Sequence, residues 1–90
     1  MTWEIRYRSS VENDIARLSS AVQKLVFQVL TELRNNPYPD GCKKLNGPSN
    51  RYRIRIQRDY RLVYSIYKKE RVMKVEFVGH RKDAYRWLNN

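Results

Sequence analysis

Arginine recurs at every second position of one short segment, and this spacing could create a site for phosphate groups. The segment contains Arg51, Arg53 and Arg55, with Tyr52, Ile54 and Ile56 between and after them. Alternate side chains of a β-strand point to opposite faces of a sheet, so a strand here would place three guanidinium groups on one face. Such a row repels itself unless an anion lies against it, and the phosphates of a nucleic acid supply that anion.

Arg61 starts the next predicted strand, where it could converge with Arg53 and Arg55. A guanidinium group binds phosphate through two parallel N–H donors. Three such groups could hold a scissile phosphate and stabilise the extra charge of its pentacoordinate transition state. The alternative is an RNA-binding stripe or a solvated strand without catalysis, and the spacing alone leaves both interpretations open.

A second basic segment runs from Gly79 to Tyr85 and is expected to open a C-terminal helix. His80 is the only histidine of the chain, and an imidazole exchanges protons near neutral pH, so it is a candidate acid or base. Tyr85 could stack on a base or donate a hydrogen bond. A single histidine after a glycine is nevertheless more often an ordinary loop residue.

Other kinds of reactive site find no support in the sequence. No pair of carboxylates adjoins a motif, no glycine-rich phosphate loop opens a helix, and no set typical of nucleophilic catalysis is present. The single cysteine, Cys42, cannot form an internal disulfide, and it cannot form a zinc site with His80 alone. The remaining chemistry is cleavage of RNA by its own 2′-OH, which requires no metal. We therefore expect neither a metal nor a small-molecule cofactor.

The positive charge lies in the second half of the chain. The protein has 90 residues and a net charge of +10. Residues 1–42 carry five basic and five acidic side chains, whereas residues 43–90 carry fourteen basic and four acidic ones. This asymmetry indicates an electrostatic binding surface. Further RNA- or ribosome-binding residues are expected at Lys43, Lys44, Arg51, Arg58 and Lys82.

A membrane is not the expected partner of this basic surface. The basic residues alternate within predicted strands and do not follow one face of an amphipathic helix. No apolar run is long enough to span a bilayer, and the first residues lack the charged-then-apolar pattern of a signal peptide. We therefore expect a cytoplasmic protein.

Hydrophobic periodicity predicts the elements that position these residues. Alternating apolar residues predict a strand over residues 3–8, and Ser9 with Glu12 fits a capping box that would start a helix. Apolar residues three and four positions apart predict two helices, over about 11–18 and 20–35.

A proline-, glycine- and asparagine-rich segment, residues 36–50, is expected to form a loop. Strands are predicted over about 51–57, 60–67 and 72–79, before a short helix that ends near Leu88. The fold class is therefore α+β, in the order β-α-α-β-β-β-α, and residues 1–90 are expected to form a single domain. The helix pair should cover one face of a small, mainly antiparallel four-stranded sheet and leave the arginine face open.

Two strings in this chain resemble the RelE/ParE superfamily of toxins from type II toxin–antitoxin systems, most closely its RelE branch. The first starts with RYRIRI at Arg51 and ends with YRLVY at Tyr64, and the second is GHRKDAY, from Gly79 to Tyr85. The expected order of elements is also that of the family, so the resemblance covers nearly the whole chain.

The resemblance implies a RelE-like fold and a ribosome-dependent endoribonuclease that cuts mRNA in the A site. Carried over by position, the residues that bind phosphate, assist proton transfer and stack on the RNA are Arg53, Arg55, Arg61, Arg81 and Tyr85. The best-known RelE members have lysines at the first two positions, and arginine does not readily act as a base. Either these two arginines serve only electrostatically or another group takes the proton, and we hypothesise that His80 contributes acid or base function.

The resemblance also implies a cognate antitoxin as a protein partner, beside mRNA on the ribosome. An acidic, amphipathic segment of the antitoxin would wrap the basic face or displace the C-terminal helix. Two other functions remain open at this stage. One is a ParE-like toxin that poisons DNA gyrase by binding, and the other is an RNA-binding module without catalytic activity.

Overall fold

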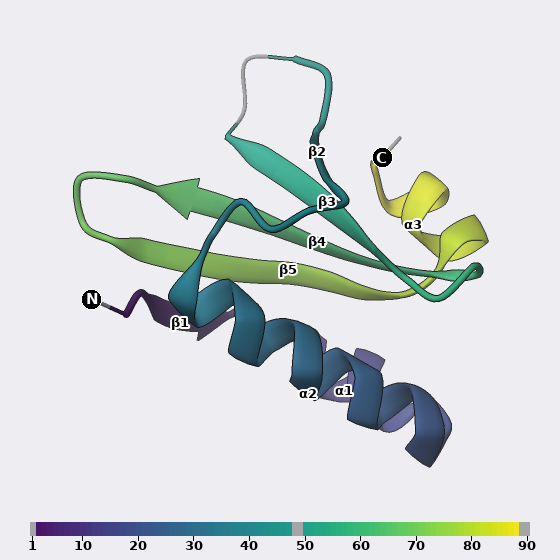
Figure 1. Ribbon diagram of the computed structural model, residues 1–90. Helices are drawn as coiled ribbons and strands as arrows, with labels where there is room; N and C mark the ends of the chain where they lie inside the picture. The colour runs from purple at the N-terminus through teal and green to yellow at the C-terminus, as the bar shows by residue number, and fades with distance from the viewer. Residues whose placement is uncertain (1, 48–49, 89–90) are drawn as a thin grey trace.

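A five-stranded sheet carries helices on both faces in the part of the chain that the computed structural model describes, residues 2–47 and 50–88 (Figure 1). No helix within these residues is long and apolar enough to cross a membrane. The elements, in chain order, are β1 (Glu4–Tyr7), α1 (Val11–Ala16), α2 (Ser20–Asn35), β2 (Cys42–Lys44), β3 (Arg51–Ile56), β4 (Tyr60–Tyr67), β5 (Val72–His80) and α3 (Arg81–Leu88).

The sheet has the strand order β1-β5-β4-β3-β2, and β1 pairs with β5 in parallel. Strands β3, β4 and β5 form two consecutive antiparallel hairpins. Each hairpin turn contains one residue in the left-handed region, Gln57 and Arg71, both with a φ of 55°. The predicted α+β class and the mainly antiparallel sheet are confirmed.

Helix α2 packs its apolar stripe against one face of the sheet. The side chain of Ser19 accepts a hydrogen bond from the N–H of Val22 and so caps the start of α2. On the sheet side, the hydroxyl of Tyr64 donates to the carbonyl of Pro37 at 2.9 Å, which fixes the chain after the helix. The buried core between the helices and the sheet includes Val11, Val22, Val26, Leu30, Leu33, Ile54, Ile56, Leu62, Tyr64 and Val75.

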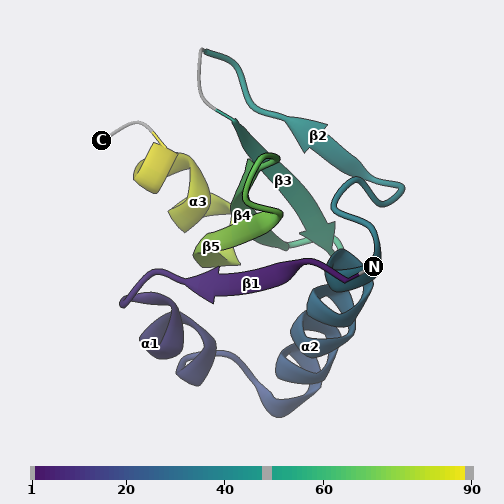
Figure 2. The same ribbon diagram turned by 90° about the vertical axis from the view of Figure 1, so that its left-hand side faces the viewer.

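Helix α3 covers part of the other face, and the prediction that this face is open is therefore wrong. Figure 2 shows α3 on the side of the sheet opposite to α1 and α2. Ala84 is buried together with Val63 and Phe77, and Trp87 and Leu88 pack around them. The spacing of these three helical residues creates an apolar stripe on a short and otherwise basic helix.

Two further predictions are corrected by the structure. The loop predicted over residues 36–50 contains the edge strand β2, which pairs antiparallel with β3, so the sheet gains a fifth strand. The predicted capping box does not form. Ser10 precedes α1 without a side-chain cap, and the turn is closed instead by the N–H of Val11, which donates to the carbonyl of Arg8 at 2.9 Å.

Candidate functional site

Strand β3 separates its apolar and basic side chains onto opposite faces of the sheet. Ile54 and Ile56 are buried against the helix pair. Arg53 pairs with Val63, which lies under α3, so Arg53 and Arg55 belong to the α3 face. Arg53 is partly exposed and Arg55 is exposed. The structure thus places both arginines as the alternation predicts.

Arg61 lies directly opposite Arg55 in the β3–β4 register. Like charges at such a position, with Cα atoms about 5 Å apart, destabilise a sheet. Arg61 is nevertheless buried, only 4% exposed, and the carbonyl dipoles that its guanidinium group contacts offset this repulsion. Its Nη1 donates to the carbonyls of Arg58 at 3.1 Å and of Tyr60 at 2.9 Å. Arg61 therefore stabilises the β3–β4 turn, a role that the sequence did not indicate.

Arg61 also keeps a capacity to bind an anion. A guanidinium group has five N–H donors, and the two carbonyls engage only Nη1. Among the described residues, no buried side-chain nitrogen lacks a hydrogen-bond partner. Arg61 thus has N–H donors beyond those that bond the turn.

Helix α3 brings Arg81 and Tyr85 to the same region. The N–H of Arg81 donates to the carbonyl of Asp59 at 2.7 Å, which ties the start of α3 to the β3–β4 turn. Arg81 and Tyr85 are four residues apart and so share one side of the helix. Asp83, on the opposite side, lines a cavity together with Asp14 of α1 and residues at the end of β5. Arg81 and Tyr85 consequently lie on the side of α3 away from this cavity, and both are exposed.

We call Arg53, Arg55, Arg61 and Arg81 the arginine cluster. In the part of the chain that the structure describes, the ion pairs are Arg6–Glu4 and Arg51–Glu76, so no carboxylate lies within 4.0 Å of the cluster. Lys43 of β2 pairs with Arg53 and adds a further cation to the same face. This concentration of unneutralised charge favours an anionic ligand with several charges.

His80 does not belong to the arginine cluster. It pairs with Tyr60, which packs on the core beneath the helix pair, and the two rings meet edge to face with centroids 5.7 Å apart. Its Nδ1 accepts the N–H of Lys82 at 3.2 Å, so it caps α3. Its ring therefore lies on the opposite face of the sheet from the arginine cluster, and an acid or base function of His80 stays an untested prediction.

The cavity beside His80 is lined by the partly buried carboxyl group of Asp14. This cavity has a volume of about 260 Å³ and is lined by Asp14, Arg17 and Asp83, among others. Asp14 accepts the N–H of Val78 at 3.3 Å, at the edge of β5 that β1 leaves unpaired. Burial raises the pKa of Asp14, and the hydrogen bond from Val78 opposes this effect.

Comparison with known proteins identifies the family. The family model described as the ParE toxin of the type II toxin–antitoxin system, parDE, matches residues 5–85. The chain belongs to this toxin family. No curated protein matches the sequence.

Solved RelE structures resemble the toxin over most of its length. The matched chain of an archaeal RelE–RelB complex from Pyrococcus horikoshii OT3 is 27% identical, with a TM-score of 0.78, and the match covers 90% of the toxin and 97% of that chain. The matched chain of the intact E. coli RelBE complex is 25% identical, with a TM-score of 0.76 and coverage of 87% and 95%. A free E. coli RelE variant, 24% identical, agrees in fold, with a TM-score of 0.79 and coverage of 97% and 92%. The protein is therefore a type II toxin of RelE/ParE fold, close to RelE.

The residues expected to extend the RNA-binding surface are divided between different parts of the toxin. Lys43 and the exposed side chains of Arg58 and Lys82 border the arginine cluster, on β2, the β3–β4 turn and the start of α3. Lys44 pairs with Tyr52 and therefore lies on the face of the helix pair. The structure thus separates Lys44 from the cluster.

Arg51 is engaged within the protein and is not a free cation. Its Nε donates to a carboxylate oxygen of Glu76 at 3.2 Å, and its guanidinium carbon lies 5.0 Å from the ring centroid of Trp87. The same carboxylate accepts the hydroxyl of Ser65. Sequence reasoning missed Glu76 and Ser65, although polar residues inside strands of apolar sequence are the signal that could have found them.

A cavity of about 430 Å³ lies at the other end of the sheet, away from the arginine cluster. It is lined by Arg6, Tyr7, Tyr67, Glu70, Val72 and Lys74. The candidate site therefore rests on charge and strand register and not on an enclosed pocket, as expected if the ligand is a macromolecule.

Proposed function

We propose that the toxin is a ribosome-dependent endoribonuclease that cuts mRNA in the A site and so inhibits translation in the cytoplasm. The arginine cluster supports this proposal, because its members lie on one face of β3 and β4 and at the start of α3 without a carboxylate partner among the described residues. Tyr85, one turn after Arg81 on α3, adds an exposed aromatic ring. Single-stranded RNA offers phosphates to the cations and a base face to the tyrosine.

The chemistry we propose uses the RNA's own 2′-OH. Its oxygen attacks the adjacent phosphorus and loses its proton to water, while the bond from phosphorus to the 5′ oxygen breaks and that oxygen takes up a proton. The products are a 2′,3′-cyclic phosphate and a 5′-OH end. The arginine cluster stabilises the extra charge on the pentacoordinate phosphorus, and it stays protonated throughout. Holding the RNA in line for attack is the contribution that we assign to the ribosome.

The antitoxin is the second partner that we propose for the cluster. A segment that carries several carboxylates would occupy the same cations and exclude the RNA. Charge complementarity would speed this encounter more than it would set the final affinity.

Primer extension on mRNA in programmed ribosomes tests the nuclease directly. The purified toxin is expected to cut at the A-site codon only when ribosomes are present. A message with a single 2′-deoxynucleotide at the cleavage position should remain intact, because it lacks the nucleophile. Equal cutting of free and ribosome-bound mRNA would contradict the proposal, and so would cutting of the deoxy-substituted message.

Poisoning of DNA gyrase is the second candidate function, and two observations favour it. The matching family model is that of ParE, and Arg53 and Arg55 replace the lysines of the best-known RelE members. A gyrase cleavage assay separates the two functions, since a gyrase poison accumulates linear DNA and leaves A-site mRNA intact. If the toxin binds ribosomes but cuts neither mRNA nor, through gyrase, DNA, the remaining interpretation is an RNA-binding module without catalytic activity.

A further inference from the structure

A buried carboxylate lies under α3 because of an irregularity in the sheet. Val63 pairs with Phe77 but Tyr64 pairs with Val75, so Glu76 is an extra residue in β5, a β-bulge. The bulge places the side chains of Glu76 and Phe77 on the same face, both beneath the helix. Glu76 is 9% exposed, and a carboxylate at this depth requires partners.

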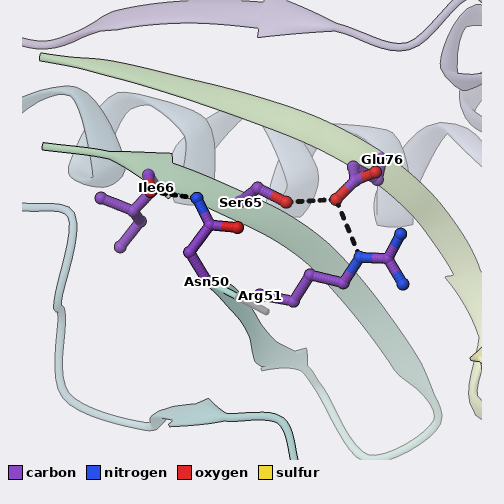
Figure 3. Close-up of polar contacts among 5 residues, drawn as sticks. All are labelled: Asn50, Arg51, Ser65, Ile66 and Glu76. Atoms are coloured by element: carbon purple, nitrogen blue, oxygen red, sulfur yellow. Dashed lines mark hydrogen bonds and ion pairs between the residues drawn. The ribbon is translucent and has the colours of Figure 1, made fainter. Parts of the chain in front are cut away.

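Its partners come from β4, which pairs with β5, and from β3, the next strand beyond β4, as Figure 3 shows. The hydroxyl of Ser65 on β4 and the Nε of Arg51 on β3 both donate to Oε2 of Glu76. Asn50 exchanges hydrogen bonds with Ile66 and so fixes the start of β3, from which Arg51 extends. The carboxylate of Glu76 therefore accepts hydrogen bonds from two side chains, the short neutral Ser65 and the long cationic Arg51.

Arg51 connects this carboxylate to α3. Its guanidinium carbon lies 5.0 Å from the ring centroid of Trp87, and the guanidinium carbon of Arg8 lies 5.6 Å from the same centroid. Trp87 also stacks on Phe77, with centroids 5.8 Å apart. The last turn of α3 is thus held by two cation–π contacts and one aromatic stack.

Helix α3 depends on such contacts because it is short. A helix of 8 residues is not stable alone in water, and Ala84 is its one fully buried residue within the described part of the chain. Arg81 and Tyr85 belong to this helix, so their position relative to β3 follows from how α3 docks.

We propose that Glu76 is a positioning residue. Through Arg51 it holds Trp87, and with it α3, against the sheet, and so sets Arg81 and Tyr85 relative to the arginines of β3 and β4. The link to catalysis rests on the proposed function, but the docking itself does not. Ser65 neutralises no charge, and its hydrogen bond to the same carboxylate does not reach α3.

Fluorescence of Trp87 tests the docking without a ribosome. The chain has two tryptophans, so Trp3→Phe leaves Trp87 as the only emitter. In this background, Glu76→Gln and Arg51→Ala are each expected to raise acrylamide quenching of Trp87 at least about twofold. Hydrogen exchange of the last turn of α3 should accelerate roughly tenfold, as expected when a charge-assisted hydrogen bond is lost. The matched control, Ser65→Ala, should leave both measurements near the parent values.

The outcomes distinguish a role of Glu76 in positioning α3 from an effect on the stability of the whole domain, and from the proposed cleavage of mRNA. Arg51 is partly exposed, so Arg51→Ala tests the inference even if Glu76→Gln does not fold. The double variant should match the stronger single variant, since both remove the same link. Unchanged quenching and exchange in folded Glu76→Gln and Arg51→Ala would overturn the inference. If the toxin cuts mRNA, Glu76→Gln should lower kcat more than it changes KM. If neither the wild type nor any variant cuts mRNA, the proposed function fails, but the fluorescence measurement still tests whether Glu76 positions α3.

Discussion

Replacing Arg61 by alanine should destabilise the toxin as well as change its charge. The change removes two hydrogen bonds from Nη1, to the carbonyls of Arg58 at 3.1 Å and Tyr60 at 2.9 Å. A hydrogen bond from a charged donor contributes roughly 1.5–3 kcal/mol, but water can reach carbonyls at a turn and replace part of it. We therefore expect a loss of about 2 kcal/mol in the free energy of unfolding. For a domain of this size, this loss lowers Tm by about 8–16 °C.

The residue opposite Arg61 provides a matched control. Arg55 carries the same side chain in the paired position of β3, but it is exposed and forms no ion pair with the described residues. Arg55→Ala should change the free energy of unfolding by no more than about 0.5 kcal/mol. Urea denaturation followed by far-UV circular dichroism compares the two variants. Equal stability of Arg61→Ala and Arg55→Ala would refute the assignment of Arg61 to the turn.

Three further predictions concern the core, the effect of pH and the binding of RNA. Tyr64→Phe removes the 2.9 Å hydrogen bond to Pro37, and urea denaturation should show a loss of about 1 kcal/mol. The pKa of Asp14 is raised in the folded state, so wild-type stability falls as pH rises through this pKa. Asp14→Asn keeps an acceptor for the N–H of Val78 and loses the buried charge, so thermal melts should show it gaining stability relative to wild type from pH 3 to pH 7. In fluorescence anisotropy with single-stranded RNA, Arg55→Ala should reduce the slope of log K against log salt by roughly 0.7, and an unchanged slope would exclude a phosphate contact.

Much of the fold follows from periodicity, because the strongest signals are local. The two-residue period of β3 and the three- and four-residue spacing of α2 each extend over a whole element, and the structure agrees with both. Strand β2 has three residues and forms by pairing with β3, a non-local contact that periodicity cannot show. The spacing of Ala84, Trp87 and Leu88 is consistent with the docking of α3. Three apolar residues in a short, mainly basic helix are too weak a pattern to predict it from the sequence.

The position of His80, away from the arginine cluster, has a specific cause in the sheet. Met73 and Val75 face the helix pair, so a regular strand would place His80 on the opposite face, with the arginine cluster. The bulge at Glu76 adds one residue and reverses this alternation for the rest of β5. A bulge leaves no pattern in a single sequence, so the arginine positions were predictable from β3 alone, whereas the side of His80 was not.

The rate of A-site cleavage in two charge variants tests the central claim most directly. Arg81 and Lys69 are both exposed cations, but Lys69 lies in the β4–β5 turn, at the end of β4 far from Arg61. Each alanine variant removes one positive charge and should remain folded. We predict that Arg81→Ala lowers the cleavage rate on saturating programmed ribosomes at least about tenfold, whereas Lys69→Ala cuts at the wild-type rate. Equal rates in the two variants, or no cleavage by the folded wild-type toxin, would contradict the assignment of an RNA-cleaving site to the arginine cluster.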